Sequence, residues 1–125
     1  MQAVIKAIGS QAFSGSEQMV ILFGETATDT LKEYSVVQRF SEKTTLQLAV
    51  GDQIKIDEQS YTIAHIGPYA LNNLNSIAHC TLVFDAFPES DPIMNGIYLE
   101  PHKLPQIKVG SIIDYQAHGA SEHGA

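Results

Sequence analysis

A chain of 125 residues, with 44% hydrophobic and 17% charged residues, has the size and balance of one compact globular domain. Seven basic residues against fourteen acidic ones give a net charge of −7, which argues against a nucleic-acid partner because phosphate backbones are bound by basic surfaces. The single cysteine, Cys80, excludes an internal disulfide and a cysteine-rich zinc site.

Short β-strands dominate the predicted elements. Each segment is rich in Val, Ile, Phe or Tyr, several alternate apolar with polar residues, and turn-forming residues separate them. In chain order, the expected strands are 3–8, 18–23, 33–40, 52–57, 61–66, 80–85, 96–100 and 111–116. The apolar run in the first of them is too short for a signal peptide or a membrane span, so a cytoplasmic location is expected.

One segment has helical periodicity instead. In "YALNNLNSIA" the apolar residues recur at intervals of three and four after Pro68, which predicts one short helix over about 69–78. Many short strands with a single helix indicate an all-β protein, a small closed or partly closed β-barrel. We expect this domain to cover 1–116 and the Gly-rich residues 117–125 to form a flexible C-terminal tail.

Three pairs of similar segments indicate that the chain contains the same unit twice. "IKAIGSQA" at 5–12 aligns with "IAHIGPYA" at 63–70, and two later pairs, "MVILF" with "CTLVF" and "VGDQIKI" with "VGSIIDY", follow in the same order. These matches predict two duplicated half-units, about 1–58 and 59–116. The alternative is that Ile-Gly and Val-Gly turns simply recur in a β protein.

His79 is the leading candidate for a chemical role. If a strand follows it, alternation points Cys80, Leu82 and Phe84 toward the core and leaves His79 and Thr81 on the other face, near the surface. A neutral exposed imidazole is a usable nucleophile, and a neighbouring hydroxyl could hydrogen-bond a phosphate group held on it. The alternative is that His79 only ends the preceding helix, where the helix dipole favours it.

The other candidates are weaker. The same alternation makes Cys80 a buried, unreactive side chain. His65 fits an ordinary strand position, and His102 lies in a proline-bracketed loop. His118 and His123 in the tail form a poor metal site, so no metal is expected.

Four segments, in their order and spacing, resemble one family. They are "IKAIGSQA…QMVILF", "LKEYSVVQ", "VGDQIKIDEQSYTIAHIG" and, above all, "ALNNLNSIAHCTLVFDA", and together they extend over about residues 1–115. This pattern resembles the glucitol/sorbitol-specific IIA component of the bacterial sugar phosphotransferase system.

The resemblance implies a function. Such a IIA component is a cytoplasmic phosphoryl carrier with a β-barrel fold. It receives a phosphoryl group from the phosphocarrier protein HPr on a histidine, and passes it to the IIB part of a IIB/IIC permease. The resemblance therefore implies that the membrane is reached only through the permease, and that no nucleotide, metal or other cofactor is needed, since the donor is already a phosphoprotein.

The sequence departs from the family at one position. The family's phosphohistidine is expected four residues after the "EY" pair, and Gln38 occupies that position here. His79 is the histidine that matches a second family histidine. Either His79 is the acceptor, with Thr81 and Gln38 as hydrogen-bonding neighbours of the phosphate, or the chain is a non-phosphorylatable binding or regulatory member. Whether the chain is a transferase component depends on which alternative holds.

Overall fold

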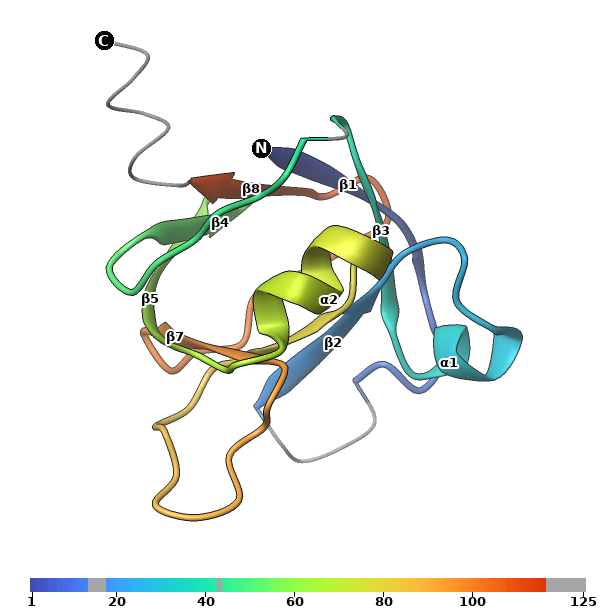
Figure 1. Cartoon of the computed structure of the whole chain (residues 1–125). Coiled ribbons are helices and arrows are strands. Elements are labelled where there is room, and N and C mark those ends of the chain that lie inside the picture. The colour runs from blue at the N-terminus through green and yellow to red at the C-terminus, as the bar shows by residue number, and fades with distance from the viewer. Residues whose placement is uncertain (14–17, 43, 117–125) are drawn as a thin grey trace, which may run out of the picture.

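The strands of the protein form one closed β-barrel in the computed structural model (Figure 1). The structure describes residues 1–13, 18–42 and 44–116, so the predicted tail at 117–125 lies outside the described residues. All eight strands, from Gln2 to Gln116, belong to the barrel. The predicted all-β barrel is therefore confirmed, in its closed form.

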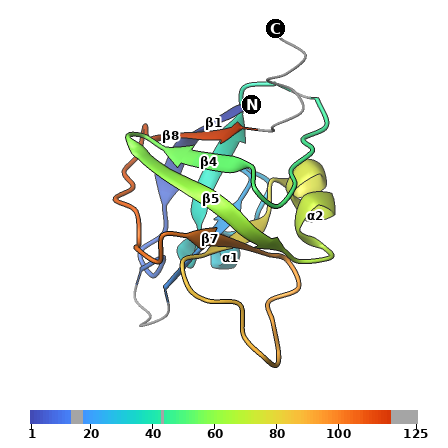
Figure 2. The ribbon, with the colours of Figure 1, turned by 90° about the vertical axis from the view of Figure 1, so that its left-hand side faces the viewer.

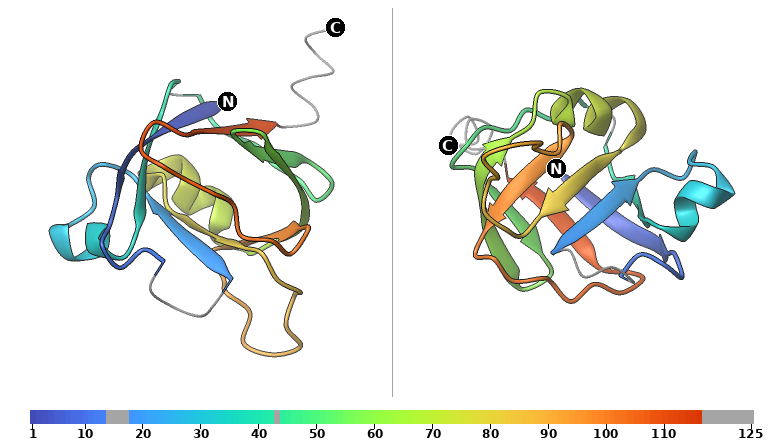
Figure 3. Two further views of the ribbon diagram at one scale, coloured as in Figure 1. Left: turned by 180° about the vertical axis from the view of Figure 1, so that it is seen from behind. Right: turned by 90° about the horizontal axis from the view of Figure 1, so that it is seen from below.

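The strands and helices of the described residues follow one another along the chain. The strands are β1 (Gln2–Ile8), β2 (Met19–Phe23), β3 (Val36–Phe40), β4 (Gln53–Ile56), β5 (Gln59–Ile66), β6 (Cys80–Val83), β7 (Gly96–Glu100) and β8 (Ile112–Gln116). The helices are α1 (Asp29–Glu33) and α2 (Ala70–Ile77). Around the barrel the order is β1-β3-β2-β6-β7-β5-β4-β8, and pairing of β8 with β1 closes it (Figure 3).

One predicted strand, 33–40, is wrong in its first part. Residues Asp29–Glu33 form helix α1, and β3 begins only at Val36. The side chain of Thr28 accepts a hydrogen bond from the backbone N–H of Leu31, which caps the first turn of the helix. The cap favours a helical turn before Val36, although the residues that follow have the composition of a strand.

The barrel has an internal two-fold arrangement. Exchanging β1–β4 with β5–β8 leaves the strand order around the barrel unchanged. Antiparallel β1–β3 then corresponds to antiparallel β5–β7, and parallel β2–β3 corresponds to parallel β6–β7. This is the arrangement expected of the two half-units predicted from the sequence.

Details of the backbone repeat as well. The β1–β3 pairing shifts register after Ile5, and the β5–β7 pairing shifts after Ile63. Gly51 and Gly110 occupy matching turns with φ of 96° and 94°, a region that favours glycine. Gly51 N–H donates to the carbonyl of Ile63, while Gly110 N–H donates to that of Ile5, both over 2.8 Å, so each half-unit ties down the other.

The core fills the barrel, and α2 lies across one of its ends (Figures 1 and 2). Ala70 and Leu74 of this helix are buried against the core. The helix ends at Ala78, which adopts the left-handed conformation with φ 55° and ψ 32°. The chain then enters β6, so the end of α2 positions the next residue, His79. Neither helix in the described residues is long and apolar enough to cross a membrane.

Candidate functional site

His79 lies between the end of α2 and the start of β6, and its ring is fixed by two hydrogen bonds. Nδ1 lies 2.9 Å from the main-chain oxygen of Leu22 in the neighbouring strand β2. Nε2 lies 2.8 Å from the side-chain amide nitrogen of Asn95, just before β7. The site is therefore built from three segments far apart in the sequence, which meet because β6 lies between β2 and β7 in the barrel wall.

These two contacts determine where the ring carries its proton. A carbonyl oxygen only accepts hydrogen bonds, so Nδ1 of His79 must carry the hydrogen that it donates to Leu22. In the neutral ring Nε2 then has a free electron pair, which accepts the N–H of Asn95. The main chain thus holds the ring in the tautomer whose Nε2 is the nucleophilic nitrogen.

The ring is half-buried against an aromatic neighbour. The rings of His79 and Phe23 stack with centroids 3.8 Å apart and planes 16° apart. His79 is thus in an intermediate position, neither inside the apolar core nor free in solvent. Stacking and two hydrogen bonds leave the imidazole one orientation.

Exposed apolar side chains lie close along the chain to residues of this site. Ile77, two residues before His79, is 45% exposed, and Met94, next to Asn95, is 46% exposed. Tyr69 is 58% exposed, and its backbone N–H donates to the carbonyl of Met94. An apolar rim around a polar group is typical of surfaces that another protein covers.

Thr81 does not lie near the surface, so that expectation is wrong. Its residue is only 5% exposed, and all four residues of β6 are buried. Parts of the segment between β6 and β7 contact the neighbouring strand β7, where Phe87 packs on Tyr98 and Ile93 N–H donates to the Tyr98 hydroxyl. Alternation correctly predicted the inward residues of β6, but the outward ones are covered as well.

Gln38 contacts the residue before His79, not the imidazole. It is 1% exposed and points into the barrel, where its amide nitrogen donates to the carbonyl of Ala78 over 3.0 Å. Its amide oxygen accepts the hydroxyl of Tyr115 over 2.7 Å. The two positions singled out by the resemblance are therefore linked through the main chain at Ala78, with their side chains on opposite sides of the barrel wall.

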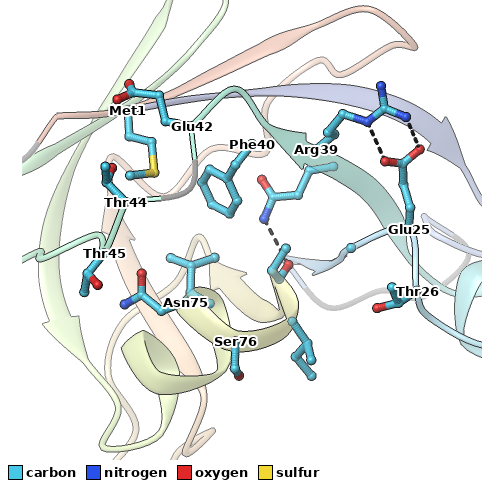
Figure 4. A pocket seen from close by; sticks show the side chains of 15 residues that line it. Met1, Glu25, Thr26, Arg39, Phe40, Glu42, Thr44, Thr45, Asn75 and Ser76 are labelled. Carbon is cyan, nitrogen blue, oxygen red and sulfur yellow. Dashed lines mark hydrogen bonds and ion pairs between the residues drawn. The ribbon is translucent and has the colours of Figure 1, made fainter.

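A pocket of about 710 Å³ opens where α2 meets the end of β3 (Figure 4). Gln38 and Ala78 are among its lining residues, whereas His79 is not. Arg39 and Glu25 form an ion pair on one side of it, and hydrogen bonds from Arg39 lower the pKa of the Glu25 carboxyl. The lining on other sides includes Phe40, Glu42, Thr44, Thr45, Asn75 and Ser76.

The remaining candidates do not join the site. His65 packs against Phe87, with ring centroids 3.9 Å apart, and His102 is exposed in the loop after β7. Cys80 is fully buried, and burial raises the pKa of its thiol to about 12, which makes it unreactive. His118 and His123 lie outside the described residues. Among the residues that the structure describes, no group of His, Cys, Asp or Glu could hold a metal ion.

Sequence reasoning did not find Asn95 or Phe23. Asn95 lies 16 positions from His79 in a connecting segment without periodicity, and it reaches the ring only because β6 and β7 pair in parallel with Thr81 opposite Gly96. A parallel pairing of consecutive strands with no helix between them has no local sequence signal.

Comparison with known proteins agrees with this fold. Residues 1–114 match the family described as PTS system glucitol/sorbitol-specific IIA component. The PTS system glucitol/sorbitol-specific EIIA components of Escherichia coli (strain K12) and Shigella flexneri are each 33% identical over 117 residues, covering 93% of this chain and 94% of theirs. A crystal structure of a PTS system IIA component from Enterococcus faecalis V583 is 52% identical with a TM-score of 0.89, covering 94% of this chain and all of that one. The chain therefore belongs to the glucitol/sorbitol-specific IIA components of the PTS, the family that its sequence segments resemble.

Proposed function

We propose that this protein carries a phosphoryl group on Nε2 of His79. Family membership supports a phosphoryl-carrier role, and IIA components in general work with HPr and with IIB and IIC components. The observation that carries the choice of atom is the hydrogen bond from Nδ1 to the Leu22 carbonyl, which in the neutral ring leaves Nε2 without a proton.

The transfer needs little covalent chemistry from the protein. The electron pair of Nε2 attacks phosphorus on the donor phosphohistidine in line, and a new P–N bond forms as the donor's P–N bond breaks. The electron pair of the broken bond returns to the donor imidazole. Nδ1 of His79 keeps its proton throughout, and its hydrogen bond to the Leu22 carbonyl stabilises the positive charge that the substituted ring acquires. The reverse step passes the group to the IIB component.

The surroundings of His79 suit a brief encounter between two proteins. Ile77, Met94 and Tyr69 offer exposed apolar surface that a docking partner can cover. Covering it excludes water from the phosphoryl group, which strengthens the hydrogen bonds that hold it. The stack on Phe23 keeps the ring oriented for attack.

Thr81 and Gln38, predicted as phosphate neighbours, enter this proposal in supporting roles. Gln38 holds the Ala78 carbonyl and so fixes the main chain from which His79 projects. The backbone N–H of Thr81 donates to the carbonyl of Asn95 over 3.1 Å, which holds the partner of Nε2 in place. The proposal includes a cytoplasmic location, with the membrane reached only through the permease.

The second candidate function is a binding or regulatory member that carries no phosphate. The observation that favours it is the state of Gln38, which occupies the position where the resemblance expects the acceptor histidine. Both ends of its amide are hydrogen-bonded inside the barrel, and glutamine offers no nucleophilic nitrogen. This protein would dock on HPr or a permease domain without taking the phosphoryl group.

Phosphorylation by purified components separates the two. With phosphoenolpyruvate, enzyme I and HPr, intact-mass spectrometry of the wild type is expected to show one phosphoryl group that acid removes. His79→Asn abolishes this addition, because no other described histidine lies in the site, whereas His65→Asn and His102→Asn retain it. Labelling that survives in His79→Asn contradicts the acceptor assignment. No labelling of the wild type, where a control IIA protein is labelled, supports the binding member.

A further inference from the structure

We infer that the side-chain amide of Asn95 is the phosphoryl-holding group of this site. In the free protein this amide donates a hydrogen bond to His79 Nε2. Once Nε2 is phosphorylated, the amide donates to a phosphoryl oxygen instead. The second part rests on the proposed function of His79, whereas the first part is a property of the free protein.

The contact between the two side chains is direct. The amide nitrogen of Asn95 lies 2.8 Å from Nε2, the position of a good N–H···N hydrogen bond. Since Nδ1 already carries the ring proton, the amide must be the donor in this bond. Asn95 therefore touches the atom that is proposed to react.

The main chain at Asn95 is fixed on both sides. Its carbonyl accepts the N–H of Thr81, and the carbonyl of the preceding Met94 accepts the N–H of Tyr69. Gly96 N–H donates to the carbonyl of Ile93, which closes the turn around Asn95. Any movement of the amide therefore comes from rotation of the side chain, and its nitrogen stays near the ring.

Phosphorylation forces that rotation. A phosphorus atom bonded to Nε2 takes the direction in which the Asn95 amide now lies. The amide must therefore move aside to make room for the phosphoryl group. Its two N–H donors then face the phosphoryl oxygens, which accept strong charge-assisted hydrogen bonds. Asn95 gives up no proton in the transfer, so the P–N bonds are the only bonds exchanged.

The donor character of this residue is the point that can be tested. Asn95→Asp keeps the shape and replaces the N–H donor by a carboxylate, which can face the ring nitrogen only if that nitrogen is protonated. The hydrogen bonds and the ring stack that the structure describes for this imidazole come from Leu22, Asn95 and Phe23, none of which has a titratable side chain. The variant thus places a single new charge against the ring.

The experiment compares Asn95→Asp and Asn95→Ala with the wild type and with Asn72→Asp. Asn72 is exposed on α2, so its variant adds the same charge away from the ring. ¹⁵N NMR of the histidine side chains follows the protonation of Nε2 with pH, and ¹H–¹⁵N spectra check that each variant is folded. Rapid-quench labelling by phosphorylated HPr gives the rate and the equilibrium extent of transfer.

In Asn95→Asp we expect Nε2 of His79 to stay protonated to higher pH, and the rate of labelling at neutral pH to fall roughly tenfold or more. In Asn95→Ala the equilibrium constant for phosphoryl transfer from HPr falls about tenfold, the usual effect of losing a hydrogen bond to a charged group. Asn72→Asp matches the wild type in both measurements.

The outcomes separate this inference from the proposed function. If the wild type is labelled at His79 and both Asn95 variants match it in rate and extent, the role of Asn95 is wrong and the acceptor stands. If the protonation of Nε2 follows pH in Asn95→Asp as it does in the wild type, the inferred hydrogen bond from Asn95 to Nε2 in the free protein is contradicted as well. If the wild type is not labelled at all, the proposed function fails, and with it the phosphoryl-holding role.

Discussion

At the scale of single residues, the surroundings of two adjacent side chains give them opposite chemistry. His79 and Cys80 follow one another, but His79 turns outward to Phe23 and Asn95, whereas Cys80 is fully buried. The imidazole keeps a free electron pair at a half-exposed position. The thiol has no solvent with which to stabilise its charged form, so it behaves as a small apolar side chain.

Cys80 makes stability depend on alkaline pH. Burial raises the pKa of the thiol from 9.0 to about 12, so above pH 9 the unfolded chain loses a proton that the folded chain keeps. The contribution of the thiol to the free energy of unfolding is therefore complete below pH 9. As the pH rises toward 12, this contribution falls by about 1.4 kcal/mol per pH unit.

Urea unfolding of the wild type and Cys80→Ala at several pH values tests this. The charge of Cys80 also raises the pKa of the buried Tyr115 hydroxyl, so the difference in slope above pH 9 reports the thiol together with its interaction with Tyr115. Equal slopes contradict the assignment. The same burial predicts that iodoacetamide alkylates Cys80 far more slowly in the folded protein than in urea.

At the scale of elements, the end of α2 determines where His79 projects. The backbone N–H of Ala78 bonds to carbonyls of the last turn while Ala78 itself adopts φ 55°. Glycine adopts this conformation without the cost of a Cβ atom, whereas alanine does not. The helix stop is thus held by the surrounding structure, including the bond from Gln38 to the Ala78 carbonyl.

Ala78→Gly is expected to raise the free energy of unfolding by about 0.5–1 kcal/mol, since the left-handed conformation is easy for glycine. Ala64→Gly is the matched control: Ala64 is exposed within β5, where the same substitution lowers stability by about 0.5–1 kcal/mol. Chemical denaturation measures both. A loss of stability in Ala78→Gly as large as in Ala64→Gly would show that the backbone conformation at Ala78 does not matter for stability.

Across the barrel, the internal two-fold arrangement repeats a position at which only glycine fits without a clash. Gly9 and Gly67 are equivalent in the two half-units, and both lie against backbone of the same half-unit. A Cβ atom on Gly9 would overlap the carbonyl oxygen of Lys32, and one on Gly67 would overlap that of Met94. The close approach at the end of β1 is therefore repeated at the end of β5.

Gly9→Ala and Gly67→Ala should each lower the free energy of unfolding by about 3 kcal/mol or more, because backbone must move to relieve the clash. Gly110→Ala is the control: its φ of 94° is strained for alanine, but no atom lies within 4 Å of the added Cβ, so about 1 kcal/mol is expected. Urea unfolding ranks the three variants. A loss in Gly9→Ala no larger than in Gly110→Ala would contradict the close approach.

Much of the fold can be predicted from the sequence. Strand composition and alternation predicted all eight strands of the described residues within three residues at each end, the start of β3 being predicted too early. Helical periodicity predicted α2, and the paired segments indicated the two halves. These features are local or repeated along the chain, so the sequence alone is enough to detect them. Helix α1 was missed because a single capping residue, Thr28, decided it.

The sequence also selected His79 but not what surrounds it. Its partners Leu22, Phe23 and Asn95 come from strands and connections that meet only when β6 lies between β2 and β7. The burial of Thr81 and the inward direction of Gln38 likewise depend on which side of a closed wall each residue occupies. Periodicity tells which residues share a face, whereas only the tertiary structure decides what covers that face, because the covering atoms come from elsewhere in the chain.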